Sequence, residues 1–198
     1  MYPSSISPED EPVTFLSRDA PFRQITEVNE YRFNDISPED IVVDIGANVG
    51  AFCIRAARRS RTVTAIEPVT AALLRDNILA NGVSVQVING ALGDGKPAEI
   101  CWDERRVIAP TYTLGMILEL AGGCNFLKCD CEGAEWLINP KELAGVRRIE
   151  MELHQPPIGS RPNPALLDYI SRYYDFEIER KPVHAALGVM GVLHAVRN

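Results

Sequence analysis

A glycine-containing turn is the segment of this sequence best suited to bind a ligand. Residues 44–50 read DIGANVG, after a short apolar run and before a helix-forming stretch. Gly46 would let the chain turn sharply beside a ligand, and Gly50 would let a helix pack closely on a sheet. Glu67 lies 21 positions after Gly46. In nucleotide-binding folds, an acidic residue about 20 positions after the glycine turn binds the ribose hydroxyls. The pattern therefore predicts a ligand that contains adenosine.

The turn differs from the one that binds dinucleotides. That pattern is G-x-G-x-x-G, which brings the backbone close to a pyrophosphate, whereas this chain has Asn48 at the middle position. Asp44 stands two residues before Gly46. Its carboxylate would repel a pyrophosphate but attract the ammonium group of a methionine moiety, so we expect S-adenosylmethionine as the cofactor. The alternative is that Asp44 only fixes the turn.

Four polar residues follow or end two later strand-like runs. They are Asp130, Glu132, Glu152 and His154, and in a parallel sheet they would lie at the same edge as the glycine turn. If the acceptor of the cofactor's methyl group is a hydroxyl, a base beside the acceptor oxygen would help the reaction. We expect His154 to be that base, with a pKa near neutrality. Two alternatives are a histidine that caps loop backbone and a Mg²⁺ or Mn²⁺ site formed by all four residues, which is not favoured.

Alternating strand-like and helix-like segments would position these residues. The expected strands are 41–46, 62–67, 83–90, 125–130 and 145–154, and the expected helices are 51–59, 70–82, 113–123 and 165–175. This alternation predicts an α/β fold with a parallel sheet and helices on both faces. Two further runs, 176–183 and 187–196, flank a short turn and predict an antiparallel hairpin at the end of the chain.

The remaining segments lack a regular pattern. We interpret 102–112 and 155–164 as long irregular loops, of which the second borders the ligand crevice. Residues 1–40 are rich in proline, serine and acids, and we expect an N-terminal arm or lid there, with a short strand or lid helix within 22–33. Residues 41–198 would then form the single catalytic domain.

Composition disfavours several classes of partner. The chain has 198 residues, 24% of them charged and 46% hydrophobic, as in one globular domain. Its 20 Lys and Arg against 27 Asp and Glu give a net charge of -7, which disfavours nucleic acid and anionic membranes. No apolar run approaches the length of a bilayer span, and the acidic start lacks a leader pattern, so we expect a cytoplasmic protein. The oligomeric state has no signal in the sequence.

Cysteine and histidine usage adds three expectations. The odd number of cysteines, 5, fits reduced thiols. We interpret Cys129 and Cys131 as core thiols rather than zinc ligands, because alternate residues of a strand share one face. His184 and His194 lie in the terminal hairpin and are expected to be structural.

Taken together, these motifs resemble those of the FkbM-type family of S-adenosylmethionine-dependent methyltransferases. The resemblance covers about residues 22–154 and is carried by VVDIGANVG, Glu67-Pro68, LLRDNILANG, NGALGD, Thr113-Leu114, FLKCDCEGAE and ELH. The block with Lys128, Asp130, Glu132, Gly133 and Glu135 narrows the match most. The family commonly has Asp after Thr-Leu, where this chain has Gly115.

The resemblance implies a Rossmann-like doubly wound sheet of seven strands, mostly parallel with an antiparallel C-terminal strand. It also implies O-methylation of a sugar, glycan or polyketide-like acceptor; alternatives are an N-methyltransferase and a non-catalytic protein that keeps the cofactor fold. By position, the cofactor would contact Asp44, Gly46, Ala47, Asn48, Gly50, Glu67, Pro68, Asn89, Gly90, Ala91, Leu92 and Asp130. Asn89-Gly90 could equally be only a turn after a strand. We expect Glu135 to begin a helix and Trp136 to pack in the core or a lid rather than to stack on adenine.

Overall fold

The computed structural model describes residues 12–17, 30–158, 160–181 and 188–198. In chain order, with 3-10 helices written η, the elements are β1 (Ile41–Ile45), α2 (Cys53–Ala57), β2 (Thr62–Ile66), α3 (Ala71–Ala80), β3 (Gln86–Ile88), β4 (Ala91–Leu92), β5 (Ala98–Trp102), β6 (Arg105–Ala109), β7 (Thr111–Tyr112), α4 (Leu114–Leu120), β8 (Phe126–Cys129), η2 (Ala134–Leu137), η3 (Pro140–Gly145), β9 (Arg148–His154), α5 (Pro164–Tyr173), β10 (Tyr174–Glu179) and β11 (Val189–Arg197).

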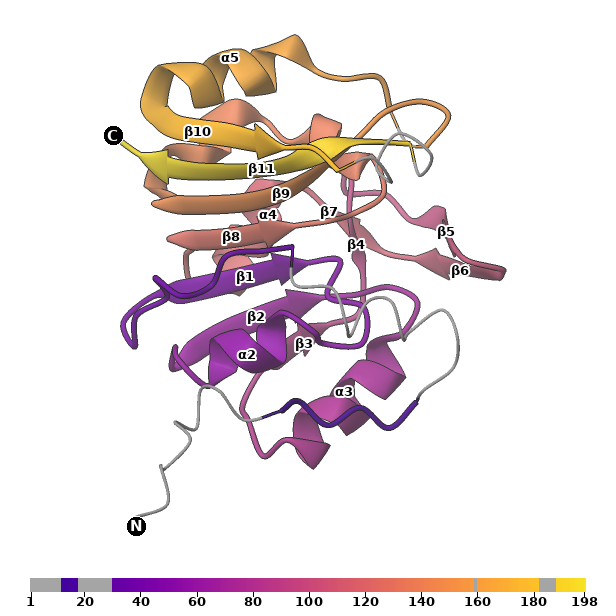
Figure 1. Ribbon diagram of the computed structural model, residues 1–198. Coiled ribbons are helices and arrows are strands. Elements are labelled where there is room, and N and C mark those ends of the chain that lie inside the picture. Colours follow the sequence, from indigo (N-terminus) through magenta and orange to yellow (C-terminus); the bar gives the residue numbers. More distant parts are fainter. Residues whose placement is uncertain (1–11, 18–29, 159, 182–187) are drawn as a thin grey trace.

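A seven-stranded sheet forms the centre of the molecule (Figure 1). Its strand order is β10-β11-β9-β8-β1-β2-β3. The pairs from β3 to β9 are parallel, whereas β11 is antiparallel to both of its neighbours. The Rossmann-like sheet and the antiparallel C-terminal strand predicted from the sequence are therefore confirmed.

Helices cover both faces of this sheet, as predicted. On one face, α4, α5 and both 3-10 helices bury apolar side chains against β1, β8, β9 and β11. On the other face, α2 and α3 pack against β1, β2 and β8, together with Ile36 from the segment before β1. Side chains from alternate positions of β1 and β8 enter different clusters: Val43 and Leu127 face the first helical layer, and Val42 and Phe126 face the second. Two apolar layers thus share one sheet.

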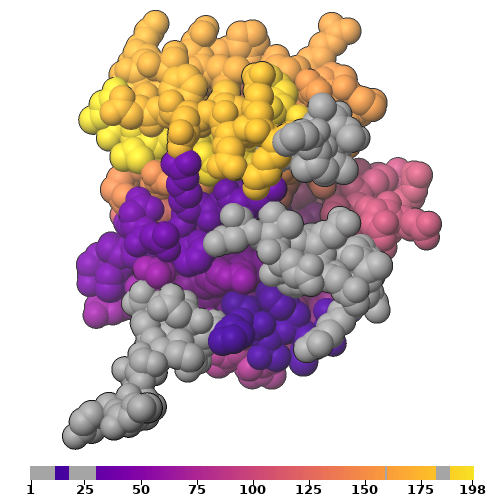
Figure 2. Space-filling model, in the orientation of Figure 1, coloured from indigo at the N-terminus to yellow at the C-terminus, as the bar shows by residue number. Residues whose placement is uncertain are grey.

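The prediction of an irregular loop over 102–112 was wrong. β5 and β6 form an antiparallel hairpin in which Trp102 pairs with Arg105, so Asp103 and Glu104 make the turn. Asp103 has a φ of 53°, a backbone region that suits a two-residue hairpin turn. Exposed and half-buried positions alternate along β5, and its apolar run, Ile100 to Trp102, is shorter than the run of about four residues or more that indicates a buried strand. Figures 1 and 2 show the hairpin projecting from the side of the molecule.

Several other elements differ from the prediction in their bounds. The helix expected over 51–59 is limited to α2, the strand expected over 83–90 is limited to β3, and β10 begins at Tyr174, before the expected 176. Within the expected lid element 22–33, the described residues 30–33 form neither helix nor strand. The rest of that element, the first 11 residues and the hairpin turn with His184 lie outside the described residues. None of the described helices has the length and apolar character needed to cross a bilayer.

Candidate active site

A cavity of about 810 Å³ lies at the carboxyl edge of β1, β2 and β8. Most of the site residues predicted from the sequence line it, namely Gly46, Ala47, Asn48, Glu67, Pro68, Ala91, Leu92, Asp130, Glu132 and Glu152. Five others, Asp44, Gly50, Asn89, Gly90 and His154, are not part of the cavity wall. The cavity therefore lies at the edge of the sheet where the sequence predicts the site, and its wall includes most but not all of the predicted residues.

The glycine turn forms one wall. Gly46 has a φ of +73°, and a Cβ atom there would lie 1.7 Å from the carbonyl oxygen of Asp130, so only glycine fits between β1 and the segment after β8. Gly50 has a φ of +96°, and a Cβ there would lie 2.8 Å from Ile54 and 2.9 Å from Leu74. The predicted role of Gly50 in close helix packing is confirmed. Gly50 does not line the cavity, so its predicted contact with a cofactor has no support there.

Glu67 forms a neighbouring part of the wall. Its side chain is buried, and three backbone amides donate hydrogen bonds to it, from Asn48 (2.9 Å), Val69 (2.6 Å) and Thr70 (2.8 Å). Hydrogen bonds to charged groups are stronger than neutral ones. They fix the carboxylate against the cavity and join it to the glycine turn through Asn48.

Asp44 does not line the cavity, so the cavity wall gives no support to its predicted contact with a ligand ammonium group. It is fully buried, and its Oδ1 lies 3.1 Å from the Nζ atom of Lys128. Lys128 also donates a hydrogen bond of 2.9 Å to the carbonyl oxygen of Gly46. Burial raises the pKa of the Asp44 carboxyl, and the Lys128 ammonium opposes that shift. The pair supports the alternative role, in which Asp44 fixes the turn.

His154 is buried, and carboxylates surround both of its ring nitrogens. Nδ1 lies 3.2 Å from Oε1 of Glu135, while Nε2 lies 3.2 Å from Oε2 of Glu152 and 3.4 Å from Oε2 of Glu132. Burial lowers its pKa, but hydrogen bonds to Glu135 and Glu152 outweigh burial and raise the pKa to about 11. The expected pKa near neutrality was wrong, and a ring that holds its proton so tightly is a poor general base at neutral pH.

The carboxylates beside His154 do face the cavity. Burial and the charge of Asp130 outweigh the opposing effect of His154 and raise the pKa of Glu152 to about 7. Burial and Asp130 also raise the pKa of Glu132. Asp130 accepts a hydrogen bond of 2.9 Å from the hydroxyl of Tyr31. Acidic groups therefore crowd one end of the cavity.

Glu135 and Trp136 hold His154 in place. Both lie in a 3-10 helix rather than in the expected α-helix. Glu135 is fully buried in the first turn of this helix, and it accepts hydrogen bonds from the backbone amides of Gly133 (2.9 Å) and His154 (2.6 Å). Trp136 is buried in the core, as predicted, and its Nε1 donates to the carbonyl oxygen of His154 (2.8 Å).

The second described histidine lies in a different network. His194 is buried in β11, and its Nδ1 lies 2.6 Å from Oε2 of Glu150. Arg148 pairs with the other oxygen of Glu150 at 2.6 Å. None of these three residues lines the cavity, which agrees with the structural role expected for His194.

Sequence reasoning missed several residues of the cavity wall. Tyr31 comes from the N-terminal segment, and Ile100, Cys101, Trp102 and Asp103 come from the β5–β6 hairpin. No motif marked these positions. Only a weak signal existed for the hairpin: residues 98–102 read AEICW, in which Ile100 and Trp102 are residue types that are enriched in strands.

Comparisons with known proteins find relatives in structure but not in sequence. No protein-family model and no curated protein sequence matches the chain. An rRNA methylase from Streptococcus thermophilus has a TM-score of 0.54 at 11% identity, over 82% of this chain and 90% of that one. A dimethyladenosine transferase from Plasmodium falciparum has a TM-score of 0.54 at 10% identity, over 93% of this chain and 64% of that one.

A third solved structure adds a different substrate class. The precorrin-6y C5,15-methyltransferase from Geobacter metallireducens has a TM-score of 0.51 at 10% identity, over 83% of each chain. Identities this low carry over the fold alone. The Rossmann-like fold class is thus confirmed, while the FkbM-type resemblance stays a prediction.

Proposed function

We propose that this protein is a methyltransferase that binds S-adenosylmethionine in the cavity at the carboxyl edge of the sheet. The observation that carries the proposal is the position of Glu67, a buried carboxylate in the cavity wall that three backbone amides hold, one of them from Asn48 of the glycine turn. Such a pair of features suits the ribose of an adenosine ligand. The fold shared with solved methyltransferases supports the same conclusion.

The residues present fit this cofactor. Gly46 places backbone without a side chain at the turn, and Ala91 and Leu92 offer an apolar surface to the adenine base of the cofactor. A cavity of about 810 Å³ lies within the range of about 300–1,000 Å³ that is usual for small-molecule sites. We assign Glu67 to the ribose, while Asp44 acts indirectly by holding Lys128 against the turn.

S-adenosylmethionine, when bound, supplies an electrophilic methyl group on a sulfonium. The protein's part is to hold an acceptor atom about 3–3.5 Å from that carbon and to keep water out. The carboxylates that face the cavity, Asp130, Glu132 and Glu152, are the groups that could take the acceptor's proton. We propose this role for them in place of His154, whose ring nitrogens are already occupied by carboxylates.

The acceptor that we propose is a hydroxyl of a small molecule or glycan. The FkbM-type resemblance supports it, and the net charge of -7 and the acidic end of the cavity disfavour nucleic acid. An amine acceptor is the alternative among enzymes. Gly115, the departure from the family pattern, lies outside the cavity wall, and a Cβ there would lie 2.7 Å from Glu142. This position therefore gives no support to a non-catalytic binding protein.

Calorimetric titration with S-adenosylmethionine tests the proposal. We expect binding to the unmodified protein, displaced by S-adenosylhomocysteine, and binding at least tenfold weaker in Glu67→Gln, because the amide loses the charge that accepts three backbone hydrogen bonds. Glu99→Gln is the matched control, since its carboxylate lies on the exposed part of the hairpin. No heat with either compound would refute the proposal. If the cofactor binds, a methyl-transfer screen of hydroxyl against amine acceptors separates the two enzyme alternatives.

A further inference from the structure

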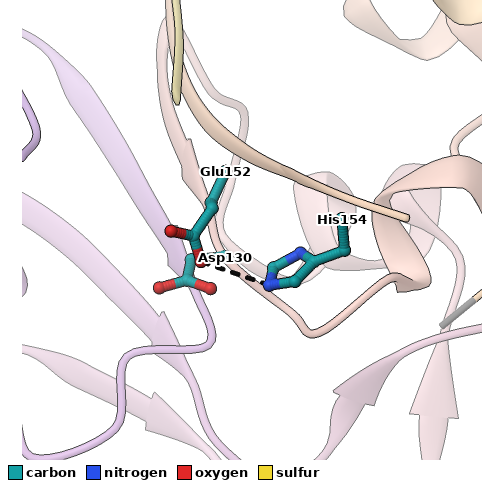
Figure 3. Close-up of side chains that lie close together, drawn as sticks. All are labelled: Asp130, Glu152 and His154. Carbon is teal, nitrogen blue, oxygen red and sulfur yellow. Dashed lines mark ion pairs between the residues drawn. The ribbon is translucent and has the colours of Figure 1, made fainter. Parts of the chain in front are cut away.

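Three side chains converge at the acidic end of the cavity (Figure 3). One oxygen from each of Asp130 and Glu152 and one ring nitrogen of His154 lie within 4.8 Å of one another. Asp130 follows β8 and the other two lie on the neighbouring strand β9. We infer that Asp130, Glu152 and His154 bind one divalent metal ion of the Mn²⁺ type.

The surroundings of the imidazole support a metal ligand. Nδ1 faces Oε1 of Glu135, which is buried and held by the backbone amides of Gly133 and His154. A histidine that binds a metal usually donates its other N–H to a carboxylate in this manner, which fixes both the tautomer and the ring orientation. With the Nδ1 proton directed at Glu135, Nε2 is the nitrogen that faces Glu152, and a metal ion would take the place of the proton that the carboxylates otherwise hold there.

A cation is needed on the Nε2 side of the ring. Two carboxylate oxygens lie close to that nitrogen, at 3.2 Å from Glu152 and 3.4 Å from Glu132. Three acceptor atoms without a cation between them would repel one another. The separation from Glu152 is also close to the distance of about 3 Å between neighbouring ligands around an ion with bonds of about 2.1 Å. Either a proton or a metal ion must fill this place.

The charge balance favours the divalent metal ion over the proton, because the metal ion carries two positive charges. Among the described residues, Asp130, Glu132, Glu135 and Glu152 surround His154, and the ammonium of Lys128 approaches Asp130 only to 4.0 Å while it pairs with Asp44 at 3.1 Å. A single proton leaves most of this negative charge unbalanced. The network of His194 is different, because Arg148 balances Glu150 there.

The donor set indicates the kind of ion. Carboxylate oxygens suit Mg²⁺ and Mn²⁺, and an imidazole nitrogen shifts the preference toward transition metals. Because Asp130 and Glu152 line the cavity, the ion would contact the acceptor and lower the pKa of its hydroxyl. With the ion bound, Glu132 is the carboxylate of the cavity wall that is left to take the acceptor's proton. Both consequences rest on the proposed function, whereas binding of the ion by itself does not.

Titration of the full chain with Mn²⁺, followed by electron paramagnetic resonance without S-adenosylmethionine, tests the site. We expect one ion per chain, with pulsed spectra that show coupling to a directly bound ¹⁴N nucleus. Asp130→Asn and Glu152→Gln should each weaken binding at least tenfold, and His154→Gln should abolish the nitrogen coupling. Glu179→Gln is the matched control, because Glu179 lies beside His194 at 3.6 Å and outside the three proposed ligands.

The outcomes separate this site from the proposed function. Mn²⁺ binding weaker than about 1 mM, binding unchanged in Asp130→Asn, or bound Mn²⁺ without nitrogen coupling would each overturn the site and indicate an imidazolium ion pair instead. The pulsed spectrum of the unmodified protein decides the question even where a variant fails to fold. Mn²⁺ binding as expected without heat from S-adenosylmethionine would refute the function and leave the metal site in place.

Discussion

Lys128 connects the separate residues of the candidate site. Its ammonium contacts Asp44 and the carbonyl oxygen of Gly46, and it lies 5.1 Å from the ring centre of Tyr31. The sequence marked Asp44 as important but could not identify its partner. That partner is set by register, because Asp44 and Lys128 are opposite one another in the parallel pair β1–β8. The sequence of one strand does not say which residue of the neighbouring strand lies opposite Asp44, so the sequence could not identify Lys128 as its partner.

His154 illustrates the same limit for electrostatics. The sequence placed it correctly at the end of a strand beside the cavity, but its pKa depends on Glu135 and Glu152. Glu135 lies 19 residues earlier in the chain and reaches the ring only because η2 packs under the end of β9. The position of a side chain followed from the pattern of strands, whereas its protonation followed from contacts that no pattern encodes.

Two glycines with similar backbone conformations allow a test of the close approach at the turn. Gly46 and Gly122 have φ values of +73° and +76°, but a Cβ at Gly46 would lie 1.7 Å from the backbone oxygen of Asp130, and one at Gly122 would meet nothing within 4 Å. Gly122→Ala should cost about 1 kcal/mol of unfolding free energy, from left-handed strain alone. Gly46→Ala should cost about 3 kcal/mol or more, because overpacking adds to that strain.

Urea denaturation of both variants measures the two values. Similar costs in the two variants would show that Gly46 serves only its backbone conformation and would contradict the tight contact between the turn and the segment after β8.

At the scale of elements, the sequence predicted the buried part of the fold better than its surface. Each parallel strand of the large sheet lies within a predicted segment, since short apolar runs such as 41–46 are typical of strands covered on both faces. The β5–β6 hairpin was missed, although it supplies one wall of the cavity. Its strands are paired only with one another and lack a buried face. Their pairing depends on a two-residue turn at Asp103-Glu104 that differs from the common Asn-Gly signal.

Thiol labelling tests the place of this hairpin at the cavity. The five cysteines are free: Cys101 is exposed on β5, Cys131 is half-buried, and the other three are buried. Burial also raises the pKa of Cys124 to about 12. We expect one thiol per folded chain to react rapidly with Ellman's reagent at pH 8, because thiolate character and access both control the rate.

Cys101→Ser should remove that fast phase. S-adenosylhomocysteine should slow it in the unmodified protein, because Cys101 lines the cavity. A fast phase that persists in Cys101→Ser would contradict the assignment of that phase to the hairpin. A labelling rate that S-adenosylhomocysteine leaves unchanged would mean that the hairpin lies outside the cofactor site.

For the whole molecule, the central question is whether the two helical layers behave as one unit. They lie on opposite faces of one sheet, and β1 and β8 contribute side chains to both. Tyr174 adds a further contact within the first layer, because its buried hydroxyl lies 2.9 Å from the carbonyl oxygens of both Leu143 and Val146 and shares its one proton between them. With the strands shared, loss of packing on one face removes support from the other. The described fold should therefore unfold as a single cooperative unit.

Leu74→Ala tests this coupling between the layers. Leu74 is fully buried in the layer of α2 and α3, and its truncation should cost about 2–5 kcal/mol. Trp136 is buried in the opposite layer, and in a Trp102→Phe background its fluorescence reports that layer alone, since the chain has 2 tryptophans. The substitution should shift the urea midpoint seen by Trp136 fluorescence as far as the midpoint seen by circular dichroism. An unchanged fluorescence midpoint would mean that the layer around Trp136 folds independently, and that damage to α3 leaves the acidic end of the cavity intact.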